Sequence, residues 1–186
     1  AHNNLGNTLR ELKQLESAIT SYQNAIAIKP NYVEAHYSLG NTFQELNQLD
    51  DAVKSYQKVL QLKPEFAAMH NNLAVILQEL GKFNTAVEHL ETALSIKLDF
   101  AEAHNNLGNA LKNLGQLDDA IKCYEKAIAI KPDYAEAHHN LGVTLQELDQ
   151  LDAAVKSYKQ ALAINTDYAE VHNNLGIALK DLGQLD

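Results

Sequence analysis

A histidine recurs in this chain at a constant step of 34 residues, and this periodicity is the strongest constraint on its fold. The six histidines are His2, His36, His70, His104, His138 and His172. A period of this length indicates that one supersecondary unit is copied along the chain, with each copy packing mainly on its neighbours. The sequence therefore predicts an array of repeats rather than a single globular core.

Aligning the copies on these histidines defines the repeat frame, in which residues 101–134 are the best-preserved copy. The whole chain is one array in this frame, with repeats at 1–32, 33–66, 67–100, 101–134 and 135–168, and a half repeat at 169–186. The first copy lacks two positions and the last lacks its second half. We therefore expect the chain to be part of a longer protein.

Each copy has the pattern of a helical hairpin. In the fourth copy, apolar residues within 103–114 recur at the spacing of one helix face. Gly115 follows, where a helix commonly ends in a left-handed residue. A second apolar stripe runs over 120–128 and stops before Pro132, which cannot continue a helix. We expect two antiparallel helices per repeat, with Asp118 as the N-cap of the second helix.

A small residue stands in the middle of every first helix. These residues are Gly6, Gly40, Ala74, Gly108, Gly142 and Gly176. A glycine inside a helix costs roughly 1 kcal/mol relative to alanine, so we expect close packing to require it. A tyrosine or leucine on the second helix is expected to fill the adjacent space.

The fourth copy also carries a set of residues at fixed spacing. They are Leu107, Gly108, Leu111, Ala120, Tyr124, Ala127 and Pro132. In this spacing the whole chain resembles the tetratricopeptide repeat (TPR) family, whose period is also 34 residues. The resemblance implies an all-α solenoid, a right-handed superhelix of antiparallel helix-turn-helix units whose first helices line a concave groove. Histidine stands where the family often has tryptophan or tyrosine.

The first helices carry asparagine at recurring positions. A ladder row contains Asn4, Asn72, Asn106, Asn140 and Asn174, with Ser38 in the second copy. A second row contains Asn7, Asn41 and Asn109. A third row contains Asn3, Tyr37, Asn71, Asn105, His139 and Asn173. A carboxamide offers one acceptor and two donors, so it can pair with a peptide bond whatever the ligand's side chains. We predict that these residues bind an extended peptide, which makes the chain a protein-interaction scaffold.

Inheritance by duplication is the alternative explanation of these rows, because glutamine also recurs without an evident role. The recurring glutamines are Gln14, Gln48, Gln116, Gln150 and Gln184. Two second-helix positions that we expect to face outward have drifted instead. One reads Thr20, Lys54, Glu88, Lys122 and Lys156, and the other reads Ser21, Ser55, His89, Cys123 and Ser157. The smaller drift on the first helices favours the binding interpretation.

An asparagine at the ladder position of successive repeats resembles the TPR arm of O-linked N-acetylglucosamine transferases. That resemblance implies a ladder that holds an acceptor polypeptide by its backbone, and the chain would then be the recognition arm of a larger protein glycosyltransferase. Another TPR subclass grips a terminal carboxylate with cations beside asparagines. Here Asn3, Tyr37 and Glu102 stand where cations would be needed, so a carboxylate clamp is disfavoured.

Composition narrows the classes of partner. The formal net charge of −9 disfavours nucleic acid, because binding phosphates requires clustered lysine and arginine. No run approaches the roughly 18 consecutive apolar residues of a membrane span, so we expect no membrane insertion. Acidic residues outnumber basic ones along the expected groove, which favours ligands that are neutral to basic. The single cysteine, Cys123, fits a reducing compartment, so we expect a cytoplasmic protein.

The chain lacks the patterns of an enzyme and of a metal site. It has no nucleophile–base pair, phosphate-cradling loop or paired carboxylates, so we expect no catalytic residues and no cofactor. Zinc needs three or four ligands about 2 Å from one point. Histidines one repeat apart stand on successive helices, too far apart for that, so we expect them to pack between repeats. The partly covered apolar stripe of the half repeat predicts end-to-end self-association.

Overall fold

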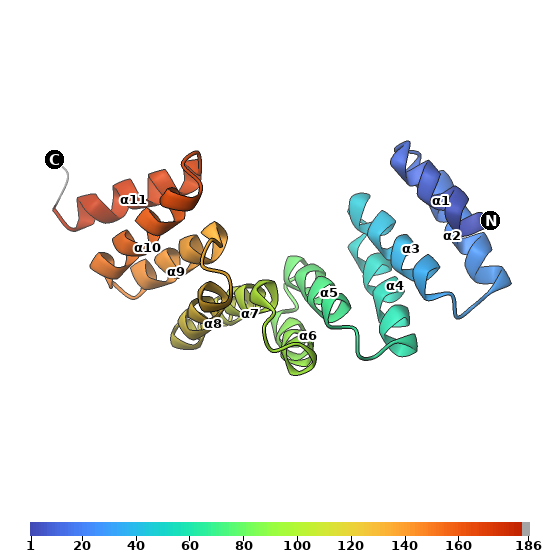
Figure 1. Ribbon diagram of the computed structural model, residues 1–186, viewed down its shortest axis with the longest axis horizontal. Coiled ribbons are helices and arrows are strands. Elements are labelled where there is room, and N and C mark those ends of the chain that lie inside the picture. The colour runs from blue at the N-terminus through green and yellow to red at the C-terminus, as the bar shows by residue number, and fades with distance from the viewer. Residues whose placement is uncertain (184–186) are drawn as a thin grey trace. The chain divides into compact units, whose positions relative to one another are not determined.

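A computed structural model describes residues 1–183, and every regular element within that range is an α-helix (Figure 1). The chain divides into two compact units, Ala1–Lys82 and Phe83–Asp186. The division falls between the two helices of the third repeat. The last three residues of the expected half repeat, Gln184 among them, lie outside the described residues.

The first unit contains two complete hairpins and the first helix of a third. Its helices are α1 (His2–Glu11), α2 (Leu15–Ile28), α3 (Val33–Glu45), α4 (Leu49–Leu62) and α5 (Ala67–Glu79). Successive helices pack against each other, and α1 also contacts α3. The first helices α1 and α3 therefore lie side by side, and α5 packs on α4.

The second unit continues the same alternation. Its helices are α6 (Phe83–Ile96), α7 (Ala101–Asn113), α8 (Leu117–Ile130), α9 (Ala135–Glu147), α10 (Leu151–Ile164) and α11 (Ala169–Asp181). Here α7 contacts α9, and α9 contacts α11, so the first helices again lie side by side. Each unit is an α-helical repeat solenoid, which confirms the predicted fold class.

The turn inside each hairpin ends the first helix as predicted. Gly115 has a φ of 76°, and its N–H donates to the Lys112 carbonyl at 2.9 Å. The next N–H, of Gln116, reaches back to the Leu111 carbonyl at 2.9 Å. These two bonds satisfy carbonyls that the helix end would leave unpaired. Asn47 and Asp149, with φ values of 57° and 59°, hold the same conformation without being glycine.

The predicted N-cap of the second helix is wrong. In the fourth repeat the helix begins at Leu117, with Gln116 at the N-cap position, and no side chain caps it. The reason is the short turn, in which Gln116 both closes the preceding helix and opens the next. Asp118 instead lies in the first helical turn, where its charge favours the positive end of the helix dipole. The same holds for Asp50 and Asp152.

Four of the mid-helix glycines are required by close packing, as predicted, but the prediction is wrong for Gly176, where an added Cβ atom would meet nothing within 4 Å. A Cβ atom built on Gly6, Gly108 or Gly142 would lie 2.5 Å from Cε1 of a tyrosine on the second helix of the same repeat. The glycine at position 40 meets its tyrosine in the same way. These tyrosines are buried, and they are Tyr22, Tyr56, Tyr124 and Tyr158. The third copy carries alanine and leucine at the two positions instead.

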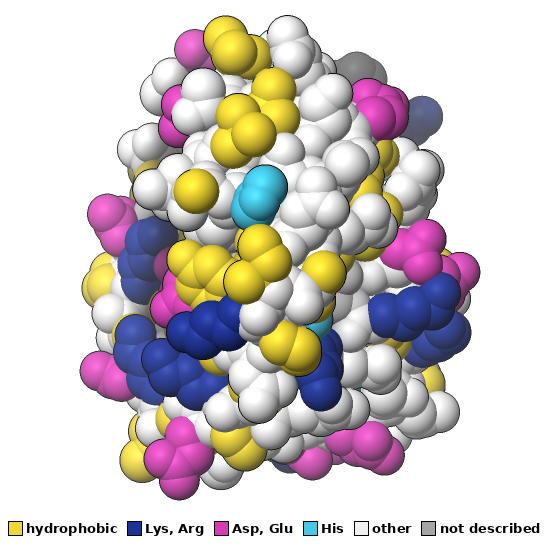
Figure 2. Space-filling view, turned by 90° about the vertical axis from the view of Figure 1, so that its right-hand side faces the viewer, with side chains coloured by type: hydrophobic (Ala, Val, Ile, Leu, Met, Phe, Trp, Pro, Cys, Tyr) yellow, Lys and Arg dark blue, Asp and Glu magenta, His cyan; other side chains and the backbone are white. Residues whose placement is uncertain are grey.

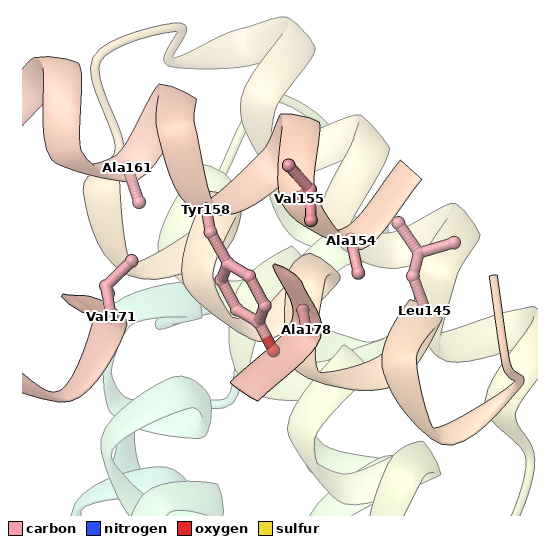
Figure 3. Packing of buried hydrophobic residues seen from close by; sticks show 7 residues of the cluster. All are labelled: Leu145, Ala154, Val155, Tyr158, Ala161, Val171 and Ala178. Carbon is pink, nitrogen blue, oxygen red and sulfur yellow. The ribbon is translucent and has the colours of Figure 1, made fainter. Parts of the chain in front are cut away.

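Alanines and branched residues pack in the same clusters as Tyr22 and Tyr158. Figure 3 shows this core at the end of the second unit, where Tyr158 points from α10 toward Ala178 on α11. Ala154 lies on the same helix and is fully buried. The large ring thus fills space that the small neighbours leave, and it joins one hairpin to the first helix of the next.

The repeated histidines form hydrogen bonds to the loops between repeats. From the second copy onward, Nε2 of each histidine lies 2.8–3.1 Å from the backbone carbonyl oxygen six residues earlier. The acceptor residues are Pro30, Pro64, Leu98, Pro132 and Thr166. Because the acceptor is a main-chain oxygen, the bond persists where leucine or threonine replaces proline. The prediction that these histidines pack between repeats is confirmed for His36, His70 and His104, which are buried. His138 is half-buried, and His2 and His172 are exposed.

Candidate peptide-binding face

The candidate site is the first-helix face, formed by α1, α3 and α5 in the first unit and by α7, α9 and α11 in the second. On each helix the third-row, ladder-row and second-row residues stand at positions i, i+1 and i+4. Positions i and i+4 stack along a helix, and i+1 lies beside them around its circumference. The three predicted rows therefore share one side of each first helix, but they differ in what covers them.

Most of the third row is buried between repeats. Asn105 is fully buried, and Asn3, Asn71 and His139 are 8%, 7% and 5% exposed. Tyr37 is half-buried, and Asn173 is exposed. The four buried side chains cannot touch a ligand in this conformation, which narrows the predicted site. Two of them, Asn105 and His139, bond to ladder-row asparagines of the next repeat.

A chain of hydrogen bonds links α7 to α9 through this row. Nδ2 of Asn105 donates to Oε1 of Glu136 at 3.0 Å, and Oδ1 of Asn105 accepts from Nδ2 of Asn140 at 3.0 Å. An ionised carboxylate can only accept, so Glu136 determines which end of the Asn105 amide faces it. The Asn105 oxygen must then face Asn140, and Asn140 is left with its own oxygen and one N–H for other partners.

Between α9 and α11 an imidazole takes the place of that amide. Nε2 of His139 lies 3.0 Å from Nδ2 of Asn174, and Nδ1 lies 3.3 Å from the Tyr168 hydroxyl. Burial lowers the pKa of His139 from its ordinary value of 6.5, which favours the neutral ring. A neutral ring that accepts from Asn174 at Nε2 must carry its proton on Nδ1 and donate it to Tyr168. Asn174 again keeps its oxygen and one N–H.

The second row is held by the core tyrosines. The hydroxyls of Tyr22 and Tyr124 donate to Oδ1 of Asn7 and Asn109 at 2.9 Å. Tyr56 donates to Oδ1 of Asn41 at 2.5 Å. Burial raises the pKa of all three tyrosines above the ordinary value of 10, so these phenols remain donors. With Oδ1 occupied, each of the three asparagines keeps both amide N–H groups for other partners.

Sequence reasoning missed these tyrosines as part of the site. The signal was present, because an asparagine precedes a tyrosine by 15 residues in three repeats. In the fifth repeat Val143 replaces the asparagine, and Tyr158 donates instead to Oε1 of Gln146 at 2.8 Å. In either case the tyrosine hydroxyl donates to a side-chain amide oxygen on the first helix.

The ladder row remains accessible, unlike most of the third row. Asn4 is exposed on α1, and the remaining members are half-buried; these are Ser38, Asn72, Asn106, Asn140 and Asn174. Together with the second row, they give the face amide groups of two kinds. Asn140 and Asn174 keep an oxygen acceptor, whereas Asn109 keeps only donors.

Ion pairs between neighbouring first helices reduce the acidic excess of the face. Glu45 lies 3.4 Å from both Arg10 and Lys13, and Glu147 lies 3.8 Å from Lys112. The side of the molecule drawn in Figure 2 likewise intersperses acidic, basic and apolar side chains. Several carboxylates at the edge of the face are exposed all the same, among them Glu34 and Glu170.

Cys123 is not on an outward surface. It is 9% exposed, and Ser21, Ser55 and Ser157 at the same repeat position are also buried. Burial raises the pKa of the Cys123 thiol, which disfavours a reactive thiolate. Only one of the two drifting positions therefore faces outward, and it carries the exposed residues Thr20, Lys54, Glu88, Lys122 and Lys156.

Two further negative findings concern the described part of the chain. Within residues 1–183, no three side chains of histidine, cysteine, aspartate or glutamate gather into a candidate metal site. None of the helices in that range combines the length and apolarity that crossing a membrane requires.

The repeat geometry can now be compared with known proteins. The family model for the TPR repeat matches residues 6–47, 40–81, 76–115, 108–149 and 146–183. The chain belongs to the TPR repeat family. This confirms the family predicted from the sequence, and the TPR solenoid is in general a scaffold for protein–protein interaction. The likeness of its face to the arm of glycosyltransferases stays a prediction.

Solved TPR structures show the same fold. MamA is 28% identical, with a TM-score of 0.82 over 89% of this chain and 96% of that chain. MamA residues 41 to the end from Desulfovibrio magneticus RS-1 are 21% identical, with a TM-score of 0.83 over 90% of this chain and 94% of that chain. YrrB, described as a TPR protein with an unusual peptide-binding site, is 24% identical. Its TM-score is 0.78 over 92% of this chain and 89% of that chain. No curated protein sequence matches the chain.

Proposed function

We propose that this chain binds an extended segment of a partner protein along its first-helix face and recognises the backbone of that segment. The observation that carries the proposal is the fixed orientation of the face's amides. The Glu136–Asn105–Asn140 chain leaves the Asn140 oxygen for a ligand, and the Tyr124 bond leaves the Asn109 amide hydrogens. A peptide bond needs both kinds of partner, because it has one N–H and one C=O.

The spacing of the repeats suits an extended ligand. Packed helices lie about 8–10 Å apart, and an extended chain advances roughly 3.3 Å per residue. Successive first helices would therefore meet about every third residue of the ligand. Intervening side chains would point elsewhere, so this face would tolerate many ligand sequences. Exposed carboxylates such as Glu34 and Glu170 at its edge would favour neutral to basic segments.

Each contact to the ligand backbone should contribute modestly to the free energy of binding. A single hydrogen bond adds about 0.5–1.5 kcal/mol net, and ordering the ligand offsets part of the sum. Useful affinity therefore requires several repeats to bind one ligand together. The bonds to the buried supports lower this cost on the protein's side, because they hold the amides in position before the ligand arrives.

The test begins with a displayed library of random 12-residue peptides selected on the chain. The best binder is then measured on a variant with Asn106, Asn140 and Asn174 all changed to alanine. At about 0.5–1.5 kcal/mol per contact, the dissociation constant should rise about tenfold or more while helicity is retained. The matched control changes three exposed amides on second helices, Asn24, Gln57 and Gln61, and should bind as the parent does.

Backbone recognition is tested on the ligand itself. N-methylation of single ligand residues should weaken binding at about every third position, because it removes a donor. Alanine substitution along the same ligand should have smaller effects. A selection that returns no binder, or a binder that depends on its side chains and tolerates N-methylation, would contradict the proposal.

A further inference from the structure

The second unit carries a groove on the side opposite the first-helix face, between the second helices α8 and α10. Its volume is about 900 Å³, and part of α9 forms its floor. The apolar lining comes from Ile121 and Ile128 on α8 and from Leu141 and Leu145 on α9. Ala153 on α10 adds an exposed small side chain at the rim, which leaves the groove open.

The first unit keeps isoleucine, isoleucine and leucine at the positions of Ile121, Ile128 and Leu141, and it differs at the other two. Phe43 stands at the position of Leu145, and Asp51 stands at that of Ala153. The Asp51 carboxylate is bound by Lys54 at 2.7 Å. An ion pair thus occupies the rim position that is a bare alanine in the second unit. The uncharged rim at Ala153 therefore distinguishes the groove of the second unit from the equivalent position of the first unit.

We infer that this groove binds an amphipathic helix of a partner protein. Its walls are helices whose backbone N–H and C=O groups already bond to each other, and the few polar side chains of the lining, such as Gln150 and Gln160, cannot pair with every group of an extended strand. A strand buried there would leave its own polar groups unpaired at considerable cost. A helix satisfies its backbone internally and can bury one apolar stripe.

The length and charge of the groove describe the partner helix further. The lining of α8 runs from Asp118 to Ala129, about 16 Å at 1.5 Å per residue, which fits about three helical turns. On α8 the wall carries Asp118 and Glu125, and on α10 it carries Lys156. Within residues 1–183 none of these three forms an ion pair, whereas the ammonium of Lys122 is bound by Asp119 at 2.8 Å.

The opposite walls thus offer opposite charges. The partner helix should carry basic residues along the flank that faces α8 and acidic residues along the flank that faces α10. These charges would fix its direction in the groove, while the apolar stripe supplies most of the binding energy.

The probe is a display library of 14-residue helical segments. Leucine is fixed along one stripe, and lysine, glutamate or glutamine is varied on each flank. Selection on the intact chain should enrich segments with one basic and one acidic flank. The affinity of the best binder should fall at least about tenfold for Ala153→Trp, which fills the groove. The control, Ala163→Trp, alters an exposed alanine of the same helix outside the groove and should bind normally.

A charge reversal gives an independent test that does not depend on filling the groove. Lys156→Glu should weaken the same binder several-fold, and Lys159→Glu, on the same helix but outside the lining, should not. Binding that survives both Ala153→Trp and Lys156→Glu would overturn the inference, as would a selection without enrichment. Self-association of the chain that Ala153→Trp abolishes, without any library binder, would assign the groove to a second copy and also overturn it.

This site is separable from the proposed peptide-binding face. The triple alanine variant of Asn106, Asn140 and Asn174 should leave binding of the library helix unchanged, because none of those residues lines the groove.

Discussion

The α7–α9 and α9–α11 junctions of the second unit use equivalent positions with different side chains. At the first junction the Asn105 amide joins Glu136 to Asn140, and at the second the His139 imidazole joins Tyr168 to Asn174. Both arrangements orient a ladder asparagine in the same way. Only the second contains a buried group that titrates near neutral pH.

The comparison shows that this position needs an acceptor for the ladder asparagine of the next repeat, and that more than one residue type can provide it. Asparagine offers an oxygen and histidine a ring nitrogen, and each accepts from the amide of the next repeat. The first junction also gains an ion pair between Lys112 and Glu147, whereas the equivalent pair on α9 and α11 is Gln146 and Asp181. The first junction is thus the more strongly bonded of the two.

The largest expected effect comes from removing the bridge at the first junction. Asn105→Leu keeps the volume but leaves the Asn140 amide without its acceptor, and it deprives Glu136 of a donor. We expect a loss of about 1–3 kcal/mol in the free energy of unfolding, measured by urea titration. Asn173→Leu, at the same row but exposed on α11, should change stability little. Equal losses in the two variants would show that the bridge has no special role.

The second prediction concerns acid sensitivity at the second junction. Because the folded pKa of His139 lies below 6.5, the unfolded chain binds the extra proton first. The neutral His139 ring therefore contributes to the stability of the folded state above the unfolded pKa. That contribution is lost as the pH falls below about 6.5. Glu170 and Glu136 oppose the shift without reversing it.

His139→Asn should therefore make the second junction resemble the first and flatten the decline of stability between about pH 6.5 and 5. Urea titrations at several pH values would measure this. His104, whose pKa burial also lowers, contributes equally to both proteins and serves as the common background. An unchanged pH profile would mean that His139 does not sense protons in the folded state.

The smallest effect should come from the ion pair that distinguishes the first junction. Lys112→Met should cost only about 0.2–1 kcal/mol, because the pair is partly exposed and its charges remain hydrated. Added salt should reduce the difference between the variant and the parent chain. A loss as large as that of Asn105→Leu would instead assign the strength of the junction to charge.

Local features of the fold were predictable because they depend on residues near each other in sequence. The left-handed residue at Gly115 and the tyrosine opposite four of the mid-helix glycines follow from helix periodicity and steric fit. The N-cap was predicted wrongly. Only Gln116 stands between Gly115 and the start of the second helix, whereas the prediction placed both Gln116 and Leu117 before the N-cap. The repeated histidines were predicted as packing residues, but their acceptor carbonyls were not foreseeable from residue type alone.

The site was predictable only in part. Helical spacing placed the three rows on one side of the first helices, but it could not tell which row the next repeat would cover. That depends on how successive hairpins pack, which buries Asn105 while leaving Asn106 partly open. The same cause misplaced Cys123, whose position looked variable and therefore exposed.

The sequence by itself determined the repeat, its two helices, its turn and its family, because a 34-residue period and the shape of each side chain are local properties. Only the tertiary structure decided which asparagines support the face and which remain open, and where the second helices leave a groove. Both depend on contacts between neighbouring repeats, which bring together residues some 30 positions apart, such as Asn105 and Glu136.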